Sequence, residues 1–159
     1  MMLSAQVPIP TPAEAIPRKS SRKAPRVIVA EPHVSLRRLL SATLADCGYR
    51  VVEASTCSQM RRALETPCDA ESPIRLVVVD HDLIDGSGIV ALETARAYGW
   101  RGPAILVLPF AGVQELDEAK TVPDSLVLGR PFDGRQLRNW ARALVPMPHA
   151  AETAAKTHR

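Results

Sequence analysis

Acidic side chains stand directly after two runs of aliphatic residues in the first half of the chain. Asp80 follows residues 76–79 (LVVV), and Glu31 follows residues 26–30 (RVIVA). Two carboxylates that meet in space repel each other unless a cation lies between them, and hard oxygen ligands of this kind suit Mg2+. An aspartate beside such a cation can attack phosphorus and carry the phosphoryl group as an aspartyl phosphate. These residue types therefore raise phosphoryl chemistry as a hypothesis, provided that the fold brings them together.

A positively charged side chain is available after a third apolar run. Arg130 directly follows residues 125–129 (SLVLG), whereas residues 104–108 (AILVL) are followed by Pro109, which offers no side-chain donor. A phosphoryl group in transfer needs positive charge and hydrogen-bond donors for its developing charge. A guanidinium supplies both, so Arg130 is the candidate partner of the two carboxylates.

Apolar runs and helical patterns alternate along the chain and predict the elements that must position these residues. Strands are expected at residues 26–30, 50–54, 74–80, 104–108 and 125–129, and helices at about 34–47, around Met60, from Ser87 onward, at 113–119 and from Asp133 onward. These five βα units predict an α/β fold, a flavodoxin-like (βα)5 doubly wound parallel sheet with strand order 2-1-3-4-5. The first and third strands are neighbours in that order, so Glu31 and Asp80 should meet at one edge. His33 is expected only to start the first helix.

The composition predicts one folded domain with a polar segment at each end. Of the 159 residues, 46% are hydrophobic and 23% charged, as in ordinary globular proteins. Residues 1–25 carry five prolines and the run RKSSRK, and residues 146–159 are Ala-rich, so both are expected to be disordered around a domain at residues 26–145. The net charge of +3 belongs to these ends, because residues 26–145 hold 14 Lys/Arg against 15 Asp/Glu. We therefore expect no nucleic-acid binding by the domain.

Cysteine spacing and hydropathy argue against several other protein classes. Cys47, Cys57 and Cys68 are ten or eleven residues apart and form no CxxC motif, which fits reduced thiols better than a disulfide or zinc framework. No apolar stretch approaches the ~18–20 residues that a membrane span requires, and no apolar core follows the basic N-terminal residues. We expect no membrane insertion and a cytoplasmic location.

Taken together, residues 26–145 resemble the receiver domain of bacterial two-component response regulators. Asp80, with Gly88 eight residues later, matches the phosphoacceptor of that family and its turn glycine. Arg130-Pro131-Phe132 matches the lysine-proline-phenylalanine signature after the fifth strand. The five strands and the spacing between their ends agree as well.

The resemblance implies a function for each of these residues. Asp80 would accept a phosphoryl group, and Arg130 would contact it in place of the family's lysine. Mg2+ would be bound by Glu31, Asp80 and Asp82, the last through its backbone carbonyl. A cis peptide bond would precede Pro131, and the Arg130 charge would meet both carboxylates.

The chain also departs from the receiver pattern. Ala30 stands where receivers usually carry the first of two acidic residues, and Ile84 replaces the proline expected four residues after the acceptor. Leu108 replaces a serine or threonine that normally contacts the phosphoryl group, and Val127 replaces an aromatic residue on the fifth strand. The usual coupling device, a hydroxyl that moves toward phosphate and draws an aromatic ring after it, is therefore missing.

The resemblance therefore predicts an atypical single-domain response regulator and not an enzyme. It would take its phosphoryl group from a histidine kinase or phosphotransfer protein and signal by protein–protein contact, with a homodimer as one form of that contact. The alternative is a pseudo-receiver, a binding module that never carries phosphate. A distant alternative is a haloacid-dehalogenase-type phosphatase, because Asp80-His81-Asp82 is also a DxD motif after a strand. Those enzymes place the motif on an early strand and have more chain after it.

Overall fold

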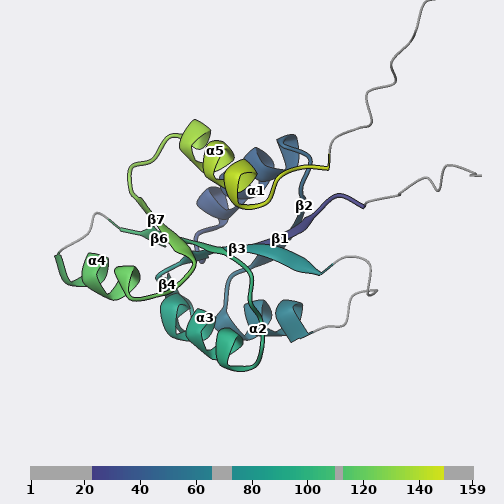
Figure 1. Ribbon diagram of the computed structural model, residues 1–159. Coiled ribbons are helices and arrows are strands. Elements are labelled where there is room, and N and C mark those ends of the chain that lie inside the picture. The colour runs from purple at the N-terminus through teal and green to yellow at the C-terminus, as the bar shows by residue number, and fades with distance from the viewer. Residues whose placement is uncertain (1–22, 66–72, 110–112, 149–159) are drawn as a thin grey trace, which may run out of the picture.

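The computed structural model describes residues 23–65, 73–109 and 113–148, which form a parallel sheet with helices on both faces (Figure 1). Most of the predicted arm at 1–25 and of the predicted tail at 146–159 lies outside these residues. So does nearly all of the segment 66–73 (TPCDAESP), whose composition predicts a loop. The predicted domain boundaries therefore stay predictions.

The strands of the main sheet coincide with the predicted ones. They are β1 (Arg26–Ala30), β2 (Arg50–Ala54), β3 (Ile74–Asp80), β6 (Ala104–Leu108) and β7 (Ser125–Gly129). The helices are α1 (Val34–Asp46), α2 (Cys57–Glu65), α3 (Gly88–Ala97), α4 (Val113–Lys120) and α5 (Gly134–Leu144). The sheet order β2-β1-β3-β6-β7 confirms the predicted flavodoxin-like order. Within the described ranges, no helix has the length and apolar character needed to cross a bilayer.

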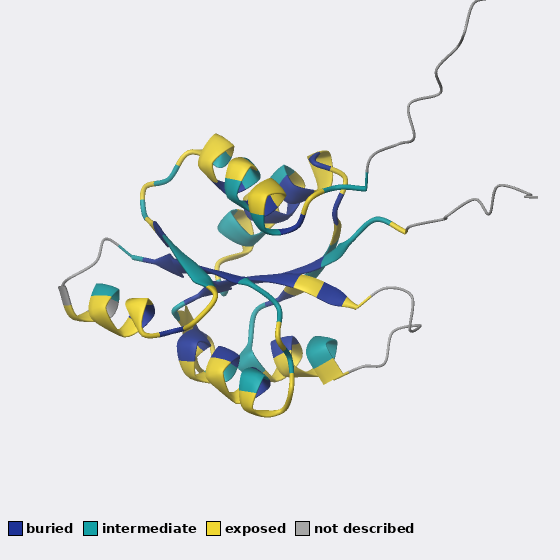
Figure 2. Cartoon of the chain, in the orientation of Figure 1, coloured by how far each residue is buried: buried dark blue, intermediate teal, exposed yellow. Residues whose placement is uncertain are grey.

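The core lies in two layers, one on each face of the sheet. Successive side chains of β1 point to opposite faces, so Val27 and Val29 pack in the layer of α1 and α5, and Ile28 and Ala30 in that of α2, α3 and α4. The three central strands are accordingly buried apart from Arg26 at the start of β1 and Arg75 near the start of β3 (Figure 2). Burying one such aliphatic side chain contributes about 1.5–3 kcal/mol. Leu39 belongs with Leu36, Leu40 and Leu44 to the helical spacing that predicts the inner face of α1, yet it is 60% exposed.

Local sequence signals delimit the helices as predicted. The Ser87 hydroxyl accepts a hydrogen bond from the backbone N–H of Val90 at 3.3 Å, and the Asp133 carboxylate accepts one from Arg135 N–H at 2.9 Å. Each satisfies a backbone donor that the first turn of a helix leaves without a partner. Gly48 follows the end of α1 with φ +97°, a left-handed conformation that favours glycine.

A two-stranded hairpin, β4 (Asp82–Leu83) and β5 (Gly86–Ser87), is formed around Asp85-Gly86, a residue pair that by itself predicts only a turn. The side chain of Asp85, at the tip of this hairpin, forms hydrogen bonds with the first residues of α2. Its carboxylate accepts hydrogen bonds from Cys57 N–H at 2.5 Å and Ser58 N–H at 3.2 Å, and from the Ser58 hydroxyl at 3.0 Å. These bonds lower the pKa of Asp85 to about 2, and the bond from the Cys57 N–H has the largest effect. Asp85 thus caps α2 from another part of the chain.

Replacing Asp85 by alanine is expected to lower the melting temperature by a few degrees, because the N–H groups of Cys57 and Ser58 lose their acceptor, although Thr56 Oγ1 still accepts a hydrogen bond from Gln59 N–H. The pKa of Asp85 is lower in the folded protein than its ordinary value of 3.8. Its contribution to stability is therefore present above about pH 4 and is lost as the pH falls toward 2. Thermal denaturation between pH 2 and 7 checks both points, with Asp117→Ala on the exposed side of α4 as a control. Equal melting temperatures for Asp85→Ala and the control at pH 7 would contradict the capping role.

Candidate functional site

Two carboxylates lie at the edge of the sheet where the carboxyl ends of β1 and β3 meet. The two strands are neighbours, with Ala30 paired to Val79, so Glu31 and Asp80 follow in adjacent positions. Glu31 is completely buried and Asp80 is 5% exposed. The structure thus brings these residues together as predicted. Buried carboxylates require hydrogen bonds and compensating charge, which the surrounding residues supply.

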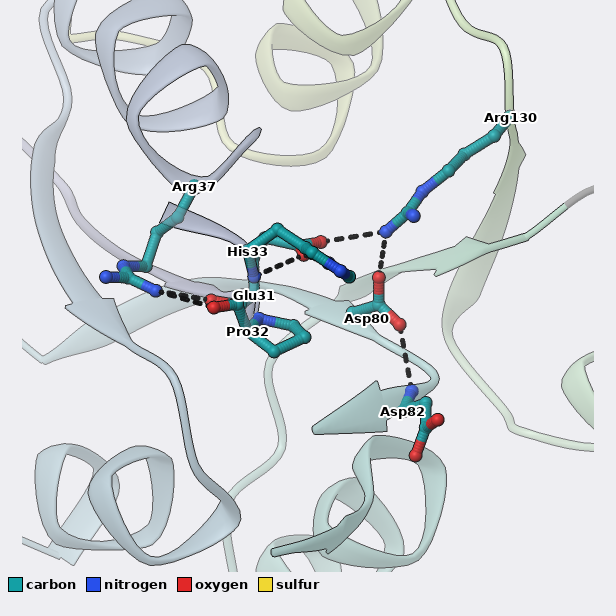
Figure 3. A network of polar contacts seen from close by, with 7 residues as sticks. All are labelled: Glu31, Pro32, His33, Arg37, Asp80, Asp82 and Arg130. Carbon is teal, nitrogen blue, oxygen red and sulfur yellow. Dashed lines mark hydrogen bonds and ion pairs between the residues drawn. The ribbon is translucent and has the colours of Figure 1, made fainter. Parts of the chain in front are cut away.

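Arg130, the residue after β7, reaches both carboxylates with a single nitrogen atom (Figure 3). Its Nη2 donates a hydrogen bond to Glu31 Oε2 at 2.9 Å and another to Asp80 Oδ2. The peptide bond between Arg130 and Pro131 is cis, as the resemblance implied. The guanidinium charge therefore lies at the point where the two carboxylates converge.

Asp82 contacts the site through its backbone N–H, which donates a hydrogen bond to Asp80 Oδ1 at 2.8 Å. Its side chain is exposed and is directed away from Asp80 (Figure 3). The predicted role of the Asp82 carbonyl as a metal ligand is not tested by this bond and stays a prediction.

Two residues that sequence reasoning did not assign to the site hold Glu31 in place. His33 is the N-cap residue of α1, as expected. Its backbone N–H donates a hydrogen bond to Glu31 Oε1 at 2.9 Å, and its ring Nδ1 lies 3.0 Å from the same oxygen. Arg37 donates from Nη1 to the carbonyl oxygens of Glu31, at 2.8 Å, and Pro32, at 3.3 Å. A polar residue two positions after a carboxylate can bond back to it, which is the signal that could have identified His33.

The environment of Asp80 changes its acidity. Burial is the largest cause and the neighbouring Glu31 carboxyl the next, and together they raise the pKa of Asp80 from 3.8 to about 6. The Asp82 N–H and the Arg130 charge act in the opposite direction and limit the rise. Asp80 is consequently ionised at neutral pH but takes up a proton in mild acid.

The Mg2+ that the resemblance implies does not fit this arrangement as it stands. Each of the four carboxylate oxygens of Glu31 and Asp80 already has a polar partner, and Arg130 bridges the pair. Among the described residues, no group of three or more His, Cys, Asp or Glu side chains is placed to hold a metal ion. Mg2+ bound by Glu31, Asp80 and the Asp82 carbonyl would share the oxygens that Arg130 Nη2 contacts.

The site opens into a cavity of about 360 Å3 on the surface. Asp80, Arg130 and His33 contribute to its lining, together with His81 and Pro109. Its lining combines charged and imidazole side chains with apolar residues such as Leu83 and Ile84. The cavity therefore borders the Asp80 carboxylate.

Comparison with solved structures places this arrangement among known folds. The chain is similar to a response regulator receiver protein from Sinorhizobium medicae WSM419, with 24% identity over 78% of this chain and 94% of the other and a TM-score of 0.65. A CheY-like receiver domain protein from Methanospirillum hungatei JF-1 has 18% identity, over 76% of this chain and 92% of the other, with a TM-score of 0.64. The chemotaxis protein CheY4 of Vibrio cholerae has 18% identity, over 77% of this chain and 99% of the other, with a TM-score of 0.66.

The fold is therefore that of response-regulator receiver domains, as the sequence resemblance predicted. No family model matches the sequence, and no curated protein matches it. Asp80 lies at the end of the central strand of this fold, and Arg130 follows the strand at its edge.

Proposed function

We propose that this chain is an atypical receiver that accepts a phosphoryl group on Asp80 and signals by contact with other proteins. One observation carries the proposal: a nearly buried carboxylate at the end of β3 borders a surface cavity and is paired with a guanidinium. Receiver domains are generally not enzymes, and this role requires only that the chain accept the group and be recognised.

The chemistry follows from the environment of Asp80. With acetyl phosphate as donor, a carboxylate oxygen of Asp80 forms a bond to phosphorus, and acetate leaves with the electron pair of the bond that breaks. The pKa of about 6 leaves Asp80 ionised at neutral pH, so the nucleophile is available. The Arg130 guanidinium supplies donors and positive charge for the phosphoryl oxygens.

In the cell, the donor would be a histidine kinase or phosphotransfer protein. The surface next to the site supports such docking, because Leu36 and Leu39 of α1 line an open hollow of about 430 Å3 with Arg130, Pro131 and Phe132. A partner that docks there would bury these apolar side chains. A second copy of the chain is a further candidate partner.

The alternative, a pseudo-receiver that never carries phosphate, is favoured by the residues beside the site. Leu108 at the end of β6 is fully buried and Val127 of β7 is half-buried, and neither supplies a hydroxyl or an aromatic ring. A phosphoryl group would therefore meet no hydroxyl at Leu108. The haloacid-dehalogenase-type phosphatase stays a distant alternative, because Asp80 ends the third strand and not an early one.

Incubation with acetyl phosphate and Mg2+, followed by intact-protein mass spectrometry, tests the proposal. We expect a mass gain of one phosphoryl group in the wild type, none in Asp80→Asn, and an unchanged gain in the control Asp117→Asn on α4. Alkaline hydroxylamine should remove the group, because it cleaves acyl phosphates. A wild type that gains no mass would favour the pseudo-receiver, and labelling of Asp80→Asn would place the acceptor elsewhere.

A further inference from the structure

We propose that the Arg130 guanidinium takes the place of a divalent cation between Glu31 and Asp80. The folded site then needs no Mg2+ to hold its two carboxylates, and Asp80 accepts a phosphoryl group without this metal. The structural half of the inference stands on the contacts of Arg130 alone. The half that concerns phosphorylation rests on the proposed function.

Every oxygen of the two carboxylates has a hydrogen-bond donor without a metal. Arg130 Nη2 donates to one oxygen of each carboxylate. The remaining oxygen of Glu31 accepts from His33 N–H, and that of Asp80 from Asp82 N–H. A metal ion between the two carboxylates would compete with Arg130 Nη2 for Glu31 Oε2 and Asp80 Oδ2.

The formal charges lead to the same conclusion. Glu31 and Asp80 together carry two negative charges, and Arg130, which contacts both, carries one positive charge. A divalent ion added beside the guanidinium would leave an excess of positive charge in a site where Glu31 is fully buried. Like charges at such short range, with little water between them, repel strongly. Mg2+ binding should therefore be weak as long as Arg130 stays in place.

Arg130 also has a donor that neither carboxylate uses. Its Nε is buried and has no hydrogen-bond partner within the part of the chain that the structure describes. A buried donor without an acceptor is unfavourable, and a phosphoryl oxygen is a strong acceptor for a guanidinium. In this account, a carboxylate oxygen of Asp80 attacks phosphorus, the donor's leaving group departs with its electron pair, and Arg130 keeps its proton throughout.

Thermal denaturation with and without Mg2+ tests the structural half. In wild type, 10 mM MgCl2 in place of EDTA is expected to change the melting temperature by less than about 1 °C. Arg130→Ala should melt at a lower temperature in EDTA, because two close carboxylates lose their cation. It should then gain about 3–6 °C with Mg2+, as for a millimolar site that the missing guanidinium has opened. Arg135→Ala, which removes an exposed charge from α5, is the matched control and should behave as wild type.

A wild type that Mg2+ stabilises as much as it stabilises Arg130→Ala would overturn the inference. If Arg130→Ala does not fold, Arg130→Gln replaces it, and the wild-type titration decides by itself, because stabilisation of several degrees would show a working metal site.

Acetyl phosphate labelling in EDTA and in Mg2+ tests whether Asp80 accepts a phosphoryl group without the metal. Equal wild-type labelling within about twofold supports it, whereas labelling that requires Mg2+ contradicts it. If the wild type is labelled in neither condition, the proposed function fails, and the melting experiment still decides whether Arg130 replaces the metal.

Discussion

Alanine in place of Gly88 is expected to destabilise the domain by about 3 kcal/mol or more and to abolish labelling of Asp80. Gly88 is the first residue of α3, and its N–H donates to the His81 carbonyl at 2.9 Å. An added Cβ would lie 1.9 Å from the Asp80 carbonyl oxygen and 2.7 Å from Val79 Cγ2. A rigid backbone atom cannot yield as a flexible side chain does, so α3 and the end of β3 would have to separate. Such overpacking of a well-filled core costs typically 1–3 kcal/mol and sometimes more.

Gly129→Ala provides a matched control for this substitution. Gly129 ends β7 directly before Arg130, yet a Cβ there would meet no atom within 4 Å. Urea denaturation should therefore show a loss of stability for Gly88→Ala and little change for Gly129→Ala. A Gly88→Ala protein as stable as wild type would mean that α3 does not pack against Asp80 as closely as described.

Asparagine in place of Asp80 is expected to stabilise the folded protein by about 2 kcal/mol at pH 7.5. The pKa of Asp80 rises from 3.8 to about 6 on folding, so its charged form is less favourable in the folded protein than in the unfolded chain. One unit of pKa corresponds to about 1.4 kcal/mol, and water in the cavity beside Asp80 should reduce the full effect. Asparagine removes the charge and still offers an oxygen to the Asp82 N–H.

The pH dependence gives the same prediction a second readout. Because the folded pKa of Asp80 is the higher one, its contribution to wild-type stability is fully present below about pH 4 and is lost as the pH rises through about 6. The advantage of Asp80→Asn over wild type should therefore appear between pH 4 and 7. Chemical denaturation at several pH values measures it. An advantage that is absent at pH 7.5, or that does not vary with pH, would contradict the raised pKa.

Much of the fold could be predicted because local physics determines it. The five strands of the main sheet begin and end at the predicted residues, since buried parallel strands appear as short aliphatic runs between polar turns. Ser87 and Asp133 cap helices as predicted, because a cap depends only on residues close in sequence. The convergence of Glu31 and Asp80 followed from strand order alone, since neighbouring parallel strands end at the same edge.

The remaining features depend on contacts between distant parts of the chain, which periodicity does not report. Asp85 caps α2 across 27 and 28 residues of sequence, and Leu39 has an apolar pattern but lies exposed. The bond between Arg130 and Glu31 spans 99 residues, and only the folded chain shows that one nitrogen serves both carboxylates. The sequence by itself therefore determined the scaffold and the residue types of the site. Tertiary structure decided how their charges are balanced, because that balance depends on distances which only packing sets.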